Sequence, residues 1–181
     1  MKEPTTRLPA ATFQELAMPL FDQLYNFAHW LTRNPTDAED LVQETYAKAL
    51  RGFGSFQAGT NFRAWIYRIL RNSFLNSRAG LKVTVPIDED GPDITLPPET
   101  TTPESLLMQR VESEMVQQAL EELPVHLREI LLLCEVEEMS YQELAETLAI
   151  PQGTVMSRLH RARKALRGLL QARMQGGRHG M

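Results

Sequence analysis

The residues best suited to chemistry lie near the carboxyl end of the chain, where a helix is expected over residues 152–170. An apolar stripe at helical spacing predicts the face that packs on its own domain: Val155, Leu159, Ala162 and Leu166. The other side carries hydroxyl and guanidinium groups, and an arginine fork can bond to O6 and N7 of guanine together. Those predicted to face a DNA groove are Thr154, Ser157, Arg158 and Arg161, and those predicted to meet phosphates beside them are His160, Arg163, Lys164 and Arg167.

A helix-turn-helix is expected around this helix. Ser140 and Glu143 have the spacing of a capping box, which predicts a short helix that ends near Leu148. A tight turn over residues 149–151 then leads into the long helix. The alternative is a solvated basic helix in another kind of helical domain, but residues 149–181 hold seven Arg or Lys and no acid. This combination favours a domain that reads the major groove of duplex DNA.

A second candidate surface interleaves aromatic rings, arginines and amides over residues 60–76. The residues whose helical spacing places them on one face are Trp65, Arg68, Asn72 and Asn76. Aromatic rings stack on unpaired bases and arginine neutralises the backbone, so this face suits single-stranded or opened DNA better than intact duplex. The alternative is that aromatic residues such as Trp65, Tyr67 and Phe74 simply belong to the core.

Charge is distributed in blocks along the chain, although the net charge is only -4. Residues 61–82 hold five Arg or Lys and no acid, whereas residues 83–148 hold 16 Asp or Glu against two Arg. Because phosphate binding depends on the local field, the two basic blocks indicate nucleic acid as a partner despite the acidic total.

The remaining composition argues against several classes of protein. Cys134 is the one cysteine, which excludes an intramolecular disulfide and suits a reducing cytoplasm. The four histidines are scattered and match no catalytic or metal-binding motif, so we expect no enzyme, no cofactor and no metal. We also expect no signal peptide and no membrane-spanning segment, and a location in the cytoplasm at the nucleoid.

Three helices are expected in the first half of the chain. Apolar spacing over residues 16–31 predicts the first, and a capping box of Thr36 and Glu39 predicts the start of the second. Asn61 can cap a third helix that runs to Ser77. The stripe that the second helix should bury consists of Ala38, Leu41, Val42, Thr45, Tyr46, Ala49 and Phe53. Three helices with short loops predict a compact bundle.

The middle of the chain differs in kind from both halves. Residues 83–103 contain five prolines and five acids, which predicts a flexible linker. Helices are expected again over residues 104–123 and from Pro124 onward, ahead of the helix-turn-helix. The expected fold is all-α, with two small helical domains at 12–80 and 104–171, a linker at 81–103, a disordered arm at 1–11 and a disordered tail at 172–181.

Three of these motifs, in this order, resemble the extracytoplasmic-function (ECF) sigma factors of the sigma-70 family. Residues 34–45 resemble region 2.2, residues 62–69 resemble the stretch that melts and reads the minus-10 element, and residues 151–163 resemble the region 4.2 recognition helix for the minus-35 element. The resemblance implies a three-helix region 2 bundle and a four-helix region 4 domain. It also implies a protein that binds core RNA polymerase and directs promoter-specific transcription initiation in a stress response.

The resemblance further implies roles for individual residues. Those that would dock on the polymerase β′ coiled coil are Asp40, Leu41, Gln43 and Glu44, while the second domain would bind the β flap. A flipped base would be held by the loop over residues 54–61, and the minus-10 strand would be contacted by Asn61, Trp65, Arg68, Arg71, Asn72 and Asn76. The minus-35 duplex would be read by Thr154, Met156, Ser157, Arg158, His160, Arg161 and Lys164, although relatives often carry a basic residue at the position of Met156.

Proteins of this family are usually silenced by an anti-sigma factor that binds between the two domains. The stretches 20–27, 32–35 and 55–61 most resemble the oxidative-stress branch, whose anti-sigma factor contains zinc and senses redox state. Cys134 is interpreted as a packing residue rather than a sensor. The alternative function is an ordinary helix-turn-helix regulator that binds duplex DNA without polymerase, and the face from Trp65 to Asn76 argues against it.

Overall fold

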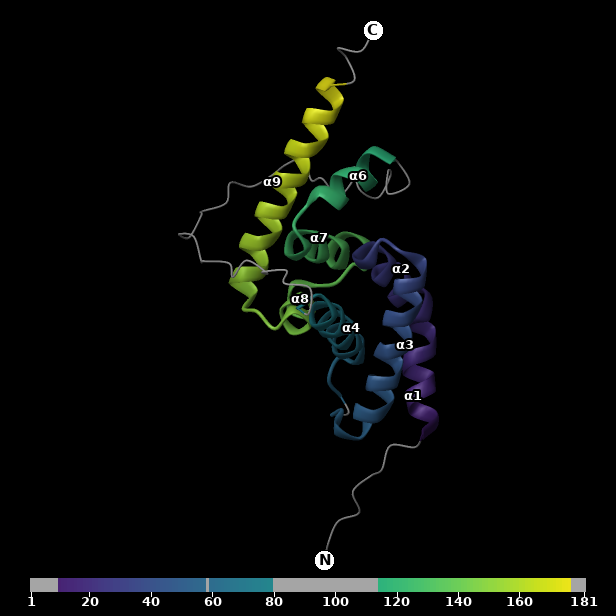
Figure 1. Cartoon of the computed structure of the whole chain (residues 1–181). Helices are drawn as coiled ribbons and strands as arrows, with labels where there is room; N and C mark the ends of the chain where they lie inside the picture. The colour runs from purple at the N-terminus through teal and green to yellow at the C-terminus, as the bar shows by residue number, and fades with distance from the viewer. Residues whose placement is uncertain (1–9, 58, 80–113, 177–181) are drawn as a thin grey trace, which may run out of the picture. The chain divides into compact units, whose positions relative to one another are not determined.

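A computed structural model describes residues 10–57, 59–79 and 114–176, and all regular structure in these ranges is helical (Figure 1). The chain divides into two compact units, Met1–Val83 and Thr84–Met181. The linker expected at 81–103 and the helix start expected at 104–113 lie outside the described residues. Of the disordered arm expected at 1–11, residues 1–9 also lie outside them, whereas residues 10 and 11 belong to a helix, so the prediction is wrong for these two. Within the described ranges, no helix is both long enough and apolar enough to cross a membrane.

The first unit begins with a helix that is interrupted. α1 (Ala10–Ala17) is followed by a 3-10 turn, η1 (Met18–Leu20), and then by α2 (Phe21–Thr32). The expectation of one continuous helix over 16–31 is therefore wrong. Pro19 has no N–H to donate and disfavours helix at the residue before it, so the chain tightens into the 3-10 turn there.

α3 (Pro35–Gly52) begins earlier than the expected capping box. Asn34 is the N-cap, and its side-chain oxygen accepts hydrogen bonds from the backbone N–H groups of Thr36 and Asp37 at 2.9 and 3.1 Å. The predicted Thr36–Glu39 capping box is wrong because Pro35, already suited to the first helical position, starts the helix one residue after Asn34. Five of the seven residues of the predicted stripe are buried, namely Ala38, Leu41, Val42, Thr45 and Ala49. Tyr46 and Phe53 are only half-buried, so the prediction is wrong for these two.

A second 3-10 turn, η2 (Phe53–Ser55), leads through a loop into α4 (Phe62–Ala79). The predicted cap of α4 is confirmed, because the side-chain oxygen of Asn61 accepts a hydrogen bond from the N–H of Ala64 at 3.1 Å. α3 packs against both α2 and α4, which is the bundle expected for this half. Its core includes Phe27 and Tyr67, whose ring centroids lie 5.5 Å apart.

The second unit is built around its last helix. α6 (Glu114–Glu122), α7 (Val125–Leu131) and α8 (Tyr141–Leu148) each contact α9 (Gln152–Gly176), and a π-helical turn, η3 (Leu132–Val136), continues α7. α9 runs six residues past the expected end at 170, so the disordered tail predicted from 172 is wrong for residues 172–176. Arg173 helps to hold this extension, since it hydrogen-bonds to Gln118 at 2.7 Å and pairs with Glu122.

The helix-turn-helix forms as expected. Ser140 caps α8 in a full capping box: its side chain accepts from the N–H of Glu143 at 3.2 Å, and the carboxylate of Glu143 accepts from the N–H of Ser140 at 2.8 Å. α8 ends where Ala149 takes a left-handed conformation, with φ of 54°. The local chemistry of residues 140–149 therefore starts and stops α8.

Candidate nucleic-acid interfaces and docking face

The predicted packing stripe of α9 is confirmed. Its four members are at most 2% exposed: Val155, Leu159, Ala162 and Leu166. Among the predicted DNA-reading residues, Met156, Ser157 and Lys164 are exposed, and Thr154, His160 and Arg161 are half-buried. We call these six residues the α9 face.

Arg158 does not belong to this face. It is only 8% exposed, so its predicted position opposite the packing stripe is wrong. The cause lies in the surroundings of α9, which packs against three other helices rather than one and so buries more than a single stripe. Long side chains can cover apolar surface with their methylene stems, and an arginine next to Leu159 is suited to that.

Arg163, predicted to meet phosphates, instead turns toward η3. Its Nε and Nη2 atoms donate to one carboxylate oxygen of Glu135 at 3.1 and 2.7 Å, and Nη2 lies 3.9 Å from the Sγ atom of Cys134. Burial lowers the pKa of Arg163, but the hydrogen bonds and charge of Glu135 outweigh that effect and leave the pKa raised. The guanidinium is therefore held in its charged form by a buried partner.

On α4, the predicted strand-contacting residues are presented unequally. Arg68, Asn72 and Asn76 are exposed along one side of the helix, whereas Trp65 and Arg71 are half-buried. Asn61 uses its side-chain oxygen to cap the helix. Tyr67 and Phe74 are 0% and 2% exposed, so the core interpretation is correct for both.

An aromatic cluster supports this end of α4, and sequence reasoning missed it. Phe56 lies 5.1 Å from Trp65 and 5.4 Å from Phe62, measured between ring centroids, and Phe53 lies 5.2 Å from Phe13. The i, i+3 spacing of Phe53 with Phe56 and of Phe62 with Trp65 was the available signal. The rings fix the two ends of the loop over residues 54–61 against the first turn of α4.

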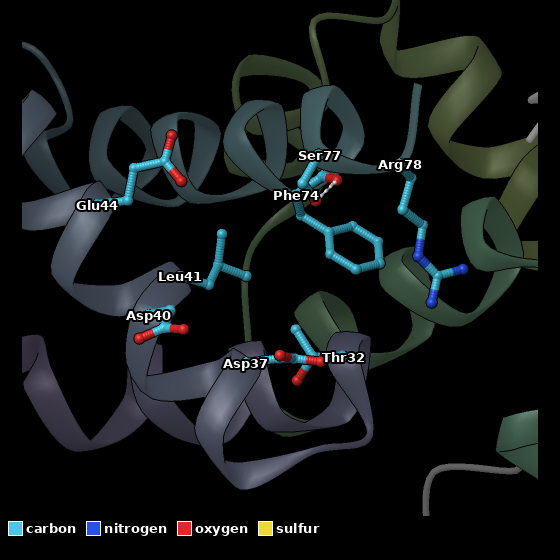
Figure 2. A pocket seen from close by; sticks show the side chains of 8 residues that line it. All are labelled: Thr32, Asp37, Asp40, Leu41, Glu44, Phe74, Ser77 and Arg78. Carbon is cyan, nitrogen blue, oxygen red and sulfur yellow. Dashed lines mark hydrogen bonds between the residues drawn. The ribbon is translucent and has the colours of Figure 1, made fainter. Parts of the chain in front are cut away.

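On α3, three of the four predicted docking residues line one hollow of about 370 Å³. Figure 2 shows Asp40, Leu41 and Glu44 along α3, with Phe74 and Arg78 facing them from α4. Gln43 is exposed and lies outside the hollow, and Leu41 is only 6% exposed. The other lining residues are Thr32, Asp37 and Ser77. The hollow thus joins an apolar floor to three carboxylates, and we call it the α3 hollow.

A further link between α3 and α4 was also missed. Lys48 pairs with Glu44 at 2.6 Å and donates a hydrogen bond to the Oγ atom of Ser73 at 3.0 Å. Ser73 is 2% exposed and follows Asn72, one of the predicted strand contacts. The edge of the α3 hollow is therefore tied directly to α4. We call the exposed side of this helix, formed by Arg68, Asn72 and Asn76, the α4 face.

Comparison with known proteins defines the class. The family model of sigma-70 region 2 matches residues 16–82, and that of sigma-70 region 4 matches residues 113–166. Together they cover most of the chain and fall on the two structural units in turn. The molecule is therefore a sigma factor of the sigma-70 type, with its region 2 and region 4 domains in the usual order.

Individual relatives narrow the family to the ECF sigma factors. The ECF RNA polymerase sigma factor SigE of Mycolicibacterium smegmatis is 37% identical over 181 residues, which cover 93% of this chain and 68% of the relative. The ECF sigma factor EcfG of Rhodopseudomonas palustris is 35% identical over 84% of this chain and 88% of the relative. The chain belongs to the ECF sigma factors, which direct RNA polymerase in transcription initiation and are not enzymes.

Solved structures show the same fold. The sigma factor RpoE of Bartonella quintana, in complex with the anti-sigma factor NepR, has a TM-score of 0.68 and 27% identity, over 90% of this chain and 98% of that one. CnrH, in complex with the cytosolic domain of CnrY, has a TM-score of 0.65 and 25% identity, over 91% of this chain and 90% of that one. In the described part of the chain, no cluster of three or more His, Cys, Asp or Glu could hold a metal ion.

Proposed function

We propose that the α9 face reads the minus-35 element as duplex DNA. The observation that carries this role is the division of α9 between a dry stripe and a polar, cationic side that includes Ser157, Arg161 and Lys164. A recognition helix needs both, because one side fixes its orientation and the other meets base edges and phosphates. Arg161 is the leading candidate for base contact and Lys164 for phosphate contact.

The α4 face is assigned to the minus-10 element in single-stranded form. Arg68, Asn72 and Asn76 are exposed on one side of α4, where cationic and amide groups can meet a displaced strand. Trp65 is anchored by Phe56 and Phe62, so it offers an edge or part of a face rather than a free ring. The loop over residues 54–61, supported by the same rings, is the candidate pocket for a flipped base.

The α3 hollow is assigned to core polymerase, with the β′ coiled coil as its partner. Asp37, Asp40 and Glu44 surround an apolar floor formed by Leu41 and Phe74. Carboxylates around an apolar floor suit a helix that presents basic residues beside apolar ones. The β flap is assigned to the second unit.

An anti-sigma factor is the second proposed partner. The solved structure of RpoE contains the anti-sigma factor NepR, and that of CnrH contains the cytosolic domain of CnrY, so both sigma factors bind a second protein. The oxidative-stress branch and a zinc-containing anti-sigma factor rest on the sequence resemblance of residues 20–27, 32–35 and 55–61. A location in the cytoplasm, at the nucleoid, follows from a role with core polymerase.

Run-off transcription with core polymerase and a genomic promoter library tests the whole assignment. Adding the chain should produce promoter-specific transcripts that core polymerase alone does not make. Their absence would contradict the role in initiation. Adding a purified anti-sigma factor that binds this chain should then suppress the same transcripts.

Two variants test the division of labour between the domains. Arg161→Ala should weaken binding of a minus-35 duplex about tenfold, because a good bidentate base contact contributes ~1–3 kcal/mol. Trp65→Ala should spare that binding but reduce permanganate reactivity in the opened minus-10 region. Trp65→Phe, which keeps an aromatic ring against Phe56, is the control for loss of packing. Equal loss of duplex binding in both alanine variants would contradict the proposed division.

A further inference from the structure

The contact between α9 and η3 is polar and partly buried. The carboxylate of Glu135 accepts two hydrogen bonds from Arg163, and the two side chains are 4% and 16% exposed. The side chain of Tyr141, at the start of α8, lies near the same guanidinium and helps to raise the pKa of Arg163. Arg163 therefore joins α9 to η3 and lies near the first turn of α8.

Arg163 lies within one turn of the residues that are assigned to DNA. His160, Arg161 and Lys164 are its near neighbours in the chain, and Lys164 is exposed where Arg163 is turned inward. Adjacent cations on one helix thus have opposite surroundings. By its charge alone, Arg163 would be expected to contact a phosphate. Its guanidinium instead donates hydrogen bonds to Glu135, 28 residues earlier in the chain.

The apolar stripe seats α9 on its domain, but it sets the rotation of the helix less sharply than a directional polar contact does. The stripe from Val155 to Leu166 is aliphatic, and aliphatic contacts have little directional preference. A guanidinium fork on a carboxylate is directional, because its N–H groups are fixed in one plane. Removing either partner would leave the other charge buried without its counter-ion.

We infer that Glu135 and Arg163 are positioning residues for DNA reading, which set the rotation of α9 so that its outer face meets the minus-35 duplex. This inference rests on the proposed role of the α9 face. Arg163 then acts through Glu135 and touches no phosphate. Glu135, an acid that would repel DNA by its charge, is required for tight binding.

The test compares Glu135→Gln, Arg163→Gln and the adjacent, exposed Lys164→Gln in full-length chain bound to core polymerase. Binding of a labelled minus-35 duplex is measured by fluorescence anisotropy at several salt concentrations, together with a duplex mutated in the element. Far-UV circular dichroism at the binding temperature shows which variants are folded. The wild-type ratio of the two dissociation constants is the reference for specificity.

Lys164→Gln should lower the slope of log K against log salt by about one and leave the specificity ratio unchanged, as for loss of a phosphate contact. Arg163→Gln should lower affinity about tenfold with an unchanged slope and a reduced ratio. Glu135→Gln should do the same, although it removes a negative charge. The double variant should lose no more than either single variant, because the two residues act as one unit.

Three results would overturn the inference. One is a fall in salt slope for Arg163→Gln equal to that of Lys164→Gln, which would make Arg163 a phosphate contact. Another is unchanged or tighter binding by Glu135→Gln. The third is equal binding of the promoter duplex and the mutated duplex by the wild-type chain. This result would also contradict the proposed role of the α9 face, whereas the first two results would contradict only the positioning role of Glu135 and Arg163.

Should Arg163→Gln be unfolded, Glu135→Gln and Arg163→Lys decide through the specificity ratio. Arg163→Lys keeps the positive charge but loses the planar fork, so it should fold and still show a reduced ratio; a wild-type ratio in Arg163→Lys would overturn the inference.

Discussion

Tyr46 is a residue whose environment has a measurable consequence. Its hydroxyl donates a hydrogen bond to the carbonyl oxygen of Ala17 at 2.6 Å and so ties α3 to the last residue of α1. Burial, and then the negative charge of Asp22, raise the pKa of Tyr46 to about 12 from the ordinary value of 10.0. The folded state therefore favours the neutral phenol.

The pH dependence of stability follows from that shift. The contribution is fully present below pH 10, where the phenol is neutral in both states. It is lost between pH 10 and about 12, since the unfolded chain releases the proton and the folded chain retains it. Urea unfolding followed by tryptophan fluorescence should show this fall in the wild type and a smaller one in Tyr46→Phe.

Tyr25→Phe is the matched control for this prediction, because it makes the same change at another half-buried tyrosine of the first unit. It should keep the wild-type fall above pH 10. An identical pH profile for Tyr46→Phe and the wild type would show that the Tyr46 hydroxyl is not held as described.

The elements begin and end through a few local contacts. Asn34 caps α3, Asn61 caps α4 and Ser140 caps α8, each by a side-chain oxygen that accepts from a backbone N–H two or three residues later. These contacts satisfy donors that the first turn of a helix leaves without partners. α3 supplies the carboxylates that line the α3 hollow. The Asn34 cap is therefore the one whose loss should most affect docking.

Asn34→Ala should therefore destabilise the first unit by ~1 kcal/mol, the usual cost of losing an N-cap. The measurement is urea unfolding followed by tryptophan fluorescence, which reports this unit because both tryptophans, Trp30 and Trp65, lie in it. Asn26→Ala is the matched control: it makes the same substitution at an exposed position inside α2 and should cost nothing. Equal losses in the two variants would contradict the cap.

At the scale of the whole molecule, the chain consists of two compact units, each with its own core. Leu24, Phe27 and Tyr67 are fully buried in the first unit. Leu144 and Leu159 are buried in the second. Residues that share one hydrophobic core unfold together. Because each unit has its own core, we expect each unit to unfold in a separate transition.

Leu159→Ala tests this expectation, since it deletes a side chain that is 1% exposed in the second unit. The loss should be ~2–5 kcal/mol, confined to that unit. Far-UV circular dichroism should show a shifted transition, while tryptophan fluorescence should keep its wild-type midpoint. Leu24→Ala, in the first unit, should shift the fluorescence midpoint and the matching part of the circular dichroism transition, and leave the part that belongs to the second unit in place. A shift of the fluorescence midpoint in Leu159→Ala would mean that the units unfold together.

The uneven distribution of charge along the chain explains how a protein with a negative net charge can bind DNA. The net charge is -4, yet residues 149–181 hold seven Arg or Lys without an acid. Local field at the α9 face therefore opposes the sign of the total. Of these cations, Arg158 is buried, Arg163 is paired with Glu135 and Arg173 with Glu122. Among the described residues, exposed Lys164 and Arg167 and half-buried Arg161 therefore remain the proposed DNA contacts.

The sequence by itself determined the all-helical class, the helix-turn-helix, the caps at Asn61 and Ser140, and the buried stripe of α9. These features depend on side chains and backbone groups within a few residues of one another, or on a helical period, and both can be read along the chain. The resemblance to ECF sigma factors likewise rested on contiguous motifs.

Only the tertiary structure decided which polar residues can contact a partner and which pair within the protein. Arg163 meets Glu135, Lys48 meets Ser73, and Phe13 meets Phe53 across long separations in sequence. Periodicity identifies the centre of a buried stripe but not its width, which depends on how many neighbours surround the helix. α9 is packed by α6, α7 and α8, and for that physical reason two of its arginines turn inward while Lys164 stays outside.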